Sequence, residues 1–167
     1  MSKIGPHFIL NPNTTTAPYA QIAPIVKAAS GMGHIAAIQM AHPNSKTIFR
    51  YIFNQDEQTR ILRECDWWFM TDAILDSLAG YRRPDLYVEL LNEIPGGITT
   101  AYIELAEHAT ERLHKNGLKV AGPSWGTGDY ETWAWNAWRA KRWANFDAIA
   151  LHAYWSHDGF TQWNALR

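Results

Sequence analysis

The stretch Asp85-Leu86-Tyr87-Val88-Glu89-Leu90-Leu91-Asn92-Glu93-Ile94-Pro95 decides the fold. Its first half is apolar and β-prone, which is typical of a strand buried on both faces in a parallel sheet. It ends in Asn92 and Glu93, and the following Pro95-Gly96-Gly97 cannot continue a ladder of strand hydrogen bonds. Enzymes built on parallel sheets keep their catalytic groups at the carboxyl ends of the strands. Taken alone, Glu93 is equally well explained as a helix cap or a solvated loop residue.

Outward from this stretch, short apolar runs alternate with segments of helical spacing. The pattern predicts strands over Lys3–Leu10, His34–Ala41, Thr47–Phe53, Asp85–Glu93, Leu118–Pro123 and Phe146–Tyr154. It predicts helices over Tyr19–Ser30, Asp56–Ala79, Ile98–Asn116 and Asp129–Trp143, with Gly80 and Gly117 as stop signals. Strands that alternate with helices over short connections indicate an α/β fold with a parallel sheet.

Two architectures fit this alternation, a doubly wound sheet and a (β/α)₈ barrel. The glycine fingerprint of doubly wound nucleotide-binding folds is absent after the first predicted strand. The pair Gly31-Met32-Gly33 follows a predicted helix, so we interpret it as a helix stop and not as a phosphate loop. No linker or low-complexity tract divides the sequence, which indicates a single domain over residues 1–167.

The composition excludes several classes of protein. Hydrophobic residues make up 47% and charged residues 19%, which is typical of a globular domain. The net charge of -1 and the lack of a basic run argue against nucleic-acid and membrane-surface binding. The single Cys65 excludes an internal disulfide and a thiolate metal site, and no cofactor motif is present. No signal peptide or membrane-length apolar segment occurs, so we expect a cytoplasmic protein with no membrane partner. The other possibility is a longer, secreted parent protein.

Polar and aromatic residues follow the predicted strands, at ends that meet on one edge of a parallel sheet. They are Asn11, Asn13, His42, Asn44, Asn54, Asn92, Glu93, Ser124, Trp125, His152, Tyr154 and Trp155. Amides and imidazoles pair with hydroxyl groups, and tryptophan offers an apolar platform to a sugar ring. The sequence holds 9 Trp, 7 Tyr and 6 Phe, although several of these must be core residues. A polyhydroxylated ligand, a carbohydrate, suits this set.

Two of these strand ends carry a resemblance to a known family. Glu89-Leu90-Leu91-Asn92-Glu93-Ile94-Pro95 resembles the fourth-strand motif of the retaining (β/α)₈ glycoside hydrolases, the clan A superfamily of cellulases, mannanases and β-galactosidases. His152-Ala153-Tyr154 resembles the sixth-strand motif of the same superfamily. One strand–helix unit separates the two motifs, as in that family. The resemblance implies a TIM-barrel fold and hydrolysis of O-glycosyl bonds in a polysaccharide or oligosaccharide.

The resemblance also implies roles for individual residues. Glu93 would be the general acid/base, and Asn92 would hold the 2-hydroxyl of the sugar at the cleaved bond. His152 and Tyr154 would order the site, with Tyr154 near the nucleophile. We expect Trp125, Trp155 and His42 to contact the sugar, although Trp125 is equally well explained as an aromatic that covers a loop.

Glu89 precedes Glu93 by four residues and therefore lies on the same side of the strand. We expect it inside the barrel, in an ion pair with Arg50, because an unpaired buried carboxylate is costly. The other possibility is a side chain that faces the helix layer.

The sequence departs from the family in one respect. The family nucleophile is a glutamate at the end of a seventh strand, whereas Arg167 lies at the start of a predicted sixth helix. No other glutamate substitutes for it, because Glu104, Glu107 and Glu111 lie on one predicted helix and Glu131 begins another. We therefore expect a barrel truncated after about six strands, without strands seven and eight. The nucleophile would lie beyond Arg167, and the chain alone would not hydrolyse glycosides.

Two other functions fit the same residues. One is a non-catalytic carbohydrate-binding barrel module that keeps the aromatic platform without a nucleophile. The other is a metal-dependent barrel hydrolase that uses His34, His42, His152 or His157. No His-x-His on the first strand and no helical histidine pair at metal-ligand spacing is present, so the sequence indicates no metal site.

Overall fold

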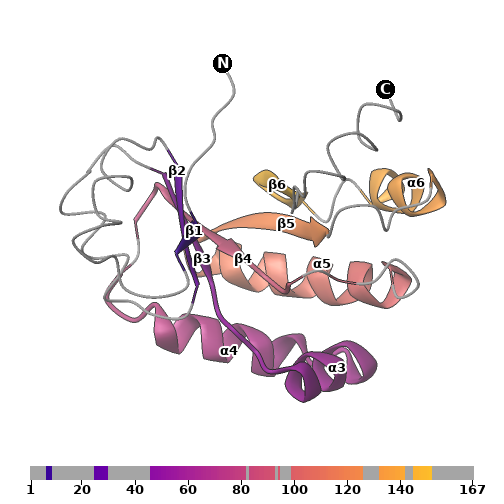
Figure 1. Ribbon diagram of the computed structural model, residues 1–167, viewed down its shortest axis with the longest axis horizontal. Helices are drawn as coiled ribbons and strands as arrows, with labels where there is room; N and C mark the ends of the chain where they lie inside the picture. Colours follow the sequence, from indigo (N-terminus) through magenta and orange to yellow (C-terminus); the bar gives the residue numbers. More distant parts are fainter. Residues whose placement is uncertain are drawn as a thin grey trace, which may run out of the picture.

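A parallel sheet of 6 strands forms the centre of this computed structural model, which describes residues 7–8, 25–29, 46–81, 83–92, 94, 99–125, 132–141 and 145–151. The strands are β1 (His7–Phe8), β2 (Ile25–Ala29), β3 (Lys46–Arg50), β4 (Leu86–Glu89), β5 (Lys119–Trp125) and β6 (Ala148–Leu151). They pair in sequence order, β1-β2-β3-β4-β5-β6, and every pair is parallel (Figure 1). The predicted α/β fold with a parallel sheet is confirmed.

Adjacent rows of register partners across the sheet differ in polarity. One row contains Ala28, Phe49, Val88 and Val120, and the next contains Ala29, Arg50, Glu89 and Ala121. Because successive side chains of a strand point to opposite faces, the two rows lie on opposite sides of the sheet. The apolar row joins the main hydrophobic core, so the row with Arg50 and Glu89 faces the other way.

Two helices, α3 (Gln55–Glu64) and α4 (Trp67–Ser77), follow β3. Asn54 caps α3 with a capping box, in which Asn54 and Glu57 exchange hydrogen bonds of 2.9 Å between side chain and backbone. Cys65 ends α3 in the left-handed conformation, with φ of 51°. The Asp66 side chain then accepts from the backbone N–H of Phe69 and caps α4. The sequence predicted one helix over Asp56–Ala79, and these two caps divide it.

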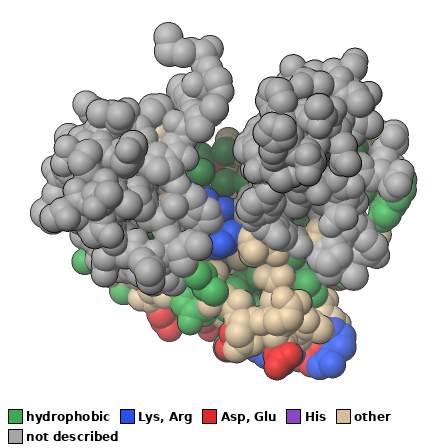
Figure 2. Space-filling model, viewed as in Figure 1, with side chains coloured by type: hydrophobic (Ala, Val, Ile, Leu, Met, Phe, Trp, Pro, Cys, Tyr) green, Lys and Arg blue, Asp and Glu red, His purple; other side chains and the backbone are tan. Residues whose placement is uncertain are grey.

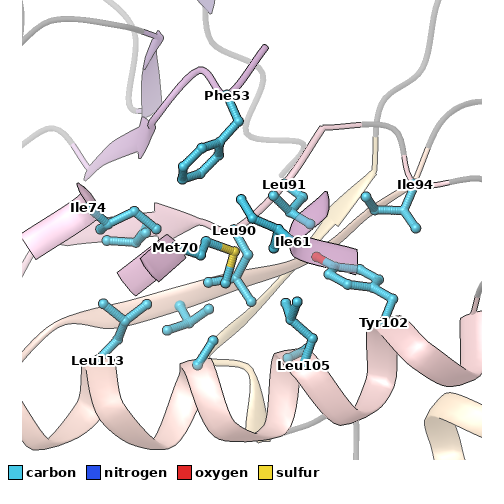
Figure 3. Close-up of a cluster of buried hydrophobic side chains, with 14 of the residues drawn as sticks. Phe53, Ile61, Met70, Ile74, Leu90, Leu91, Ile94, Tyr102, Leu105 and Leu113 are labelled. Atoms are coloured by element: carbon cyan, nitrogen blue, oxygen red, sulfur yellow. The ribbon is translucent and has the colours of Figure 1, made fainter. Parts of the chain in front are cut away.

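The helix α5 (Thr99–Lys115) packs against α4 and against β5. Figure 3 shows side chains of α5, among them Tyr102, Leu105 and Leu113, directed toward Leu90 and Met70. The helix ends at Gly117, whose φ of 76° is the left-handed value that the glycine stop signal predicted. The last described helix, α6 (Thr132–Ala140), buries Trp138 against Tyr102 of α5, with ring centroids 5.5 Å apart.

The prediction of a helix over Tyr19–Ser30 is wrong for its second half. Residues Ile25–Ala29 form β2, which pairs with β3 along its whole length from Ile25 opposite Lys46 to Ala29 opposite Arg50. The apolar residues there have helical spacing by coincidence, and parallel pairing to β3 outweighs this local pattern. The strand predicted over His34–Ala41 lies outside the described residues.

The described surface carries both signs of charge. On the face seen in Figure 2, acidic and basic side chains lie intermixed at the lower edge of the view, where Figure 1 shows α3 and α4. Within the described ranges, no helix combines the length and the apolar character that crossing a bilayer requires.

Candidate functional site

The carboxyl ends of β3 and β4 lie next to each other, because Arg50 and Glu89 are register partners at the ends of these strands. Asn92 follows β4 by three residues and is half-buried. The guanidinium Nη1 of Arg50 donates a hydrogen bond to Oδ1 of Asn92. Arg50 is only 8% exposed, so this bond forms in a largely dry environment where it is strong.

The bond from Arg50 fixes which end of the Asn92 amide faces the sheet. A guanidinium group has donors and no acceptor, so the atom in contact with it must be the amide oxygen. The Nδ2 amino group of Asn92 therefore points away from Arg50 and remains a donor for another group. A hydroxyl oxygen is a suitable acceptor for such a donor.

Gln58 holds the backbone of Asn92 from a different element. Its Nε2 donates to the Asn92 carbonyl oxygen at 3.0 Å, and its Oε1 accepts from the Asn92 N–H at 3.4 Å. Gln58 lies on the first turns of α3, and the capping box at Asn54 sets where this helix begins. The start of α3 therefore determines the position of the segment that leads into Glu93.

A pocket of about 230 Å³ opens at this edge. The lining residues come from β3 and the loop after it, from α3 and from the segment after β4: Arg50, Tyr51, Ile52, Phe53, Gln55, Gln58 and Asn92. Two aromatic rings of this lining, Tyr51 and Phe53, lie 4.6 Å apart. The pocket therefore combines amide and guanidinium donors with aromatic surface, which suits a ligand with hydroxyl groups and apolar ring faces.

Glu89 is fully buried, on the sheet face opposite the helix-packed row. Its carboxylate forms an ion pair with Lys27 of β2, and Lys27 is also mostly buried. The described contacts correct the predicted pair of Glu89 with Arg50. Although Arg50 is the register neighbour of Glu89, its guanidinium reaches toward the carboxyl edge and binds Asn92. Lys27 lies on β2, and its ammonium group extends past β3 to the Glu89 carboxylate on β4.

The end of β5 forms the other side of this edge. Ser124 is fully buried with φ of 65°, and the pairing with β6 shifts there, so that Trp125 lies opposite Leu151. Within the described residues, the Ser124 hydroxyl has no hydrogen-bond partner. The backbone of Trp125 belongs to β5, and its side chain lies outside what the structure describes.

Several predicted site residues lie outside the described residues: His42, Glu93, His152, Tyr154 and Trp155. Their roles stay predictions. The described part brings together Arg50, Asn92 and the pocket beside them, directly before Glu93 in the chain. Sequence reasoning did not find Gln58 or Lys27. The predicted helix over Tyr19–Ser30 concealed Lys27, and nothing in the sequence distinguishes Gln58 from other helical glutamines.

Cys65 has an environment that disfavours nucleophilic chemistry. Burial raises the pKa of its thiol, and the negative charge of Glu104 raises it further. The thiol therefore stays protonated at neutral pH, and the thiolate is the reactive form. Among the described side chains, no group of three or more His, Cys, Asp or Glu residues could hold a metal ion. No family model matches this sequence, and neither a curated protein nor a solved structure matches the chain.

Proposed function

We propose that the chain carries the acid/base half of a retaining glycosidase site, with Glu93 as general acid/base and Asn92 as the residue that binds the 2-hydroxyl. The observation that carries the proposal is the double hold on Asn92 at the carboxyl end of β4. Arg50 binds its side-chain oxygen and Gln58 binds its backbone, so its amino group is presented as a fixed donor. Such preorganisation is what transition-state stabilisation requires.

The proposed architecture is a (β/α)₈ barrel of which six strands are described. Three features support it: all strands are parallel, they pair in sequence order without a reversal, and α5 packs on one face while Arg50 and Glu89 lie on the other. A doubly wound sheet reverses its strand order at a switch point, and the described order contains no reversal. In a barrel the row with Arg50 and Glu89 would face inward.

The reaction would divide between two carboxyl groups. The Glu93 carboxyl would give its proton to the leaving glycosidic oxygen, and a carboxylate about 5–5.5 Å away would attack the anomeric carbon. The resemblance places that carboxylate on a seventh strand, after the six described ones. His152 and Tyr154 would order the site, and His42, Trp125 and Trp155 would contact the sugar.

An external nucleophile tests this proposal with the 167-residue chain itself. Azide added to a panel of aryl β-glycosides would attack the anomeric carbon while the bond to the aryl oxygen breaks and Glu93 protonates that oxygen. The product is a glycosyl azide of inverted configuration. We expect azide-dependent release of a poorly acidic phenol, and we expect Glu93→Gln to lower its rate by roughly 10²–10⁴-fold. A 2,4-dinitrophenyl leaving group needs no proton, so the variant should lose much less with it.

The matched control is Glu104→Gln, a change of the same type on the exposed surface of α5. It should leave the azide-dependent rate unchanged. Absence of azide-dependent release across the panel, or equal rates in the parent and Glu93→Gln, would refute the proposal. Glycan binding at this edge without any turnover would instead favour the non-catalytic carbohydrate-binding module.

A further inference from the structure

The outer surface of the helix layer contains a second depression, which shares no residue with the pocket at Asn92. It has a volume of about 270 Å³ and lies between α4 and α5. Trp67 and Trp68 line it from α4, and α5 and the residue after it contribute His108, Glu111, Arg112, Lys115 and Asn116. We call it the tryptophan depression.

Trp68 is held firmly although it is exposed. The guanidinium of Arg112 lies over its ring, 3.7 Å from the centroid, and also donates to the Trp68 carbonyl at 3.0 Å and to the Thr71 hydroxyl at 2.6 Å. An ion pair with Asp72 completes the environment of Arg112. Trp68 nevertheless exposes 56% of its surface. The exposed part of the ring is therefore area that Arg112 does not cover.

Trp67 adds a second aromatic wall at a steep angle. Its ring centroid lies 5.3 Å from that of Trp68, with 71° between the planes, and it stacks on His108 at 5.4 Å. A tryptophan fixed in place loses little conformational entropy when a ligand stacks on it. The two rings therefore form a preorganised apolar corner on the protein surface.

The charges around this corner are compensated in pairs. Lys115 binds Glu111 at 2.7 Å, and Arg112 pairs with Asp72. The hydrogen bond from Lys115, with its positive charge, holds the pKa of Glu111 below its usual value, so this pair stays ionised and neutral as a unit. The local field selects neither an anion nor a cation. Carboxylate and amide oxygens at the rim remain able to accept from hydroxyl groups.

A further depression, of about 570 Å³, continues the surface across α5. It lies between α5 and α6, and His108 belongs to both depressions. Its rim repeats the same chemistry, because Glu107 and Lys141 form an ion pair of 3.5 Å. The two depressions together suit an extended ligand more than a single small molecule.

We propose that the tryptophan depression binds a neutral polysaccharide chain, with a sugar ring stacked on the corner of Trp67 and Trp68. Sugar rings have flat apolar faces that stack on tryptophan and hydroxyl edges that pair with a polar rim. The compensated charges match an uncharged polymer, and the adjoining depression extends the surface along a chain. The proposal does not require Glu93 to act on a substrate, so it stands apart from the proposed glycosidase activity.

Affinity electrophoresis in gels cast with soluble β-glucan, galactomannan or xylan tests the proposal. All proteins carry Asn92→Ala, which weakens any binding at the strand edge. We expect one polymer to retard this parent, and Trp68→Ala to raise the Kd for that polymer roughly tenfold or more. Trp133→Ala is the matched control, since Trp133 is 49% exposed on α6 and lines neither depression. It should bind like the parent.

The proposal fails if no polymer retards the parent, or if the parent and Trp68→Ala are retarded equally. Trp68→Phe separates lost stacking from lost folding, because it keeps a smaller ring and should bind between the two. The depression could instead bind a second copy of the chain, and sedimentation of the parent and Trp68→Ala tests for such a dimer. A dimer that Trp68→Ala dissociates would assign this surface to self-association. The azide experiment tests Glu93 alone, so its failure would leave these results unchanged.

Discussion

The two faces of the sheet differ in what the same strands place on them. Toward the helices, Phe49, Val88 and Val120 form a continuous apolar row within the core. One residue further along each strand, the opposite face has the charged neighbours Arg50 and Glu89. Because side chains alternate along a strand, neighbouring residues serve different roles: one packs in the hydrophobic core and the next makes polar contacts on the other face.

The polar face is stabilised by specific pairwise contacts, and not by buried apolar surface. Glu89 binds Lys27, and Arg50 binds Asn92. Nearer the amino ends of the strands, Lys46 and Lys119 lie over the Tyr87 ring at 5.6 and 5.4 Å from its centroid. Substitutions on the apolar face should therefore act through lost packing, and substitutions on the polar face should depend on the identity of the partner.

Phe49→Ala should give the largest effect. It removes a fully buried ring from the helix-facing row and should lower the free energy of unfolding by about 4 kcal/mol. Urea titration measures the loss. Ile48→Ala, on the opposite face of the same strand and only partly buried, is the control and should cost clearly less. Equal losses would remove the distinction between the faces.

Lys27→Met comes next. It leaves the Glu89 carboxylate buried without this cation and should cost about 3 kcal/mol of unfolding free energy, again by urea titration. Adding Glu89→Gln should restore part of the loss, because the buried charge disappears with its partner. Lys46→Met, on the same face but exposed, loses only a cation–π contact with Tyr87 and should cost at most about 1 kcal/mol. A double variant as unstable as the sum of the single ones would contradict the pairing.

Gln58→Leu tests whether Gln58 holds the Asn92 backbone at the carboxyl end of β4. It removes both hydrogen bonds to the Asn92 backbone and should cost about 1–2 kcal/mol. The Asn92 amide should also exchange its proton faster, and the azide-dependent rate should fall. Gln55→Leu, which changes the neighbouring pocket residue without touching Asn92, should leave the exchange rate unchanged. An unaltered exchange rate in Gln58→Leu would mean that the glutamine does not hold this segment.

Glu111→Gln should give the smallest effect and a pH dependence of known sign. The pKa of Glu111 is lowered from 4.5 by the hydrogen bond and charge of Lys115. A lowered folded-state pKa contributes stability above that value, and the contribution is lost as the pH falls through the lowered pKa. Thermal melts should therefore show a small difference between parent and variant at neutral pH, and none in strong acid. A difference that grows in acid would contradict the assignment.

The sequence predicted those elements whose local signals agree with their tertiary surroundings. The apolar run before Asn92 is strand β4, and the glycine stop at Gly117 ends α5. The burial of Glu89 also followed from its position in the strand. The signals failed in two places for different reasons. Long-range pairing with β3 makes Ile25–Ala29 a strand, and local caps at Cys65 and Asp66 divide a continuous apolar stripe into two helices.

The candidate site could also be predicted only in part. Asn92 was found because it ends a recognisable strand. Arg50 was predicted as the partner of Glu89 because Lys27 fell in a predicted helix, whereas Lys27 lies on β2 and forms the ion pair. Gln58 contacts a residue 34 positions away through its side-chain amide, and no periodicity marks such a contact.

The contact of Gln58 with Asn92 has a consequence for how this protein can change. Gln58 binds only the main chain at position 92, and every residue type except proline offers the same N–H and carbonyl groups there. The backbone position of residue 92 therefore does not depend on which side chain the residue has. A substitution at position 92 can therefore replace the amide with another functional group while the backbone that carries it keeps its position.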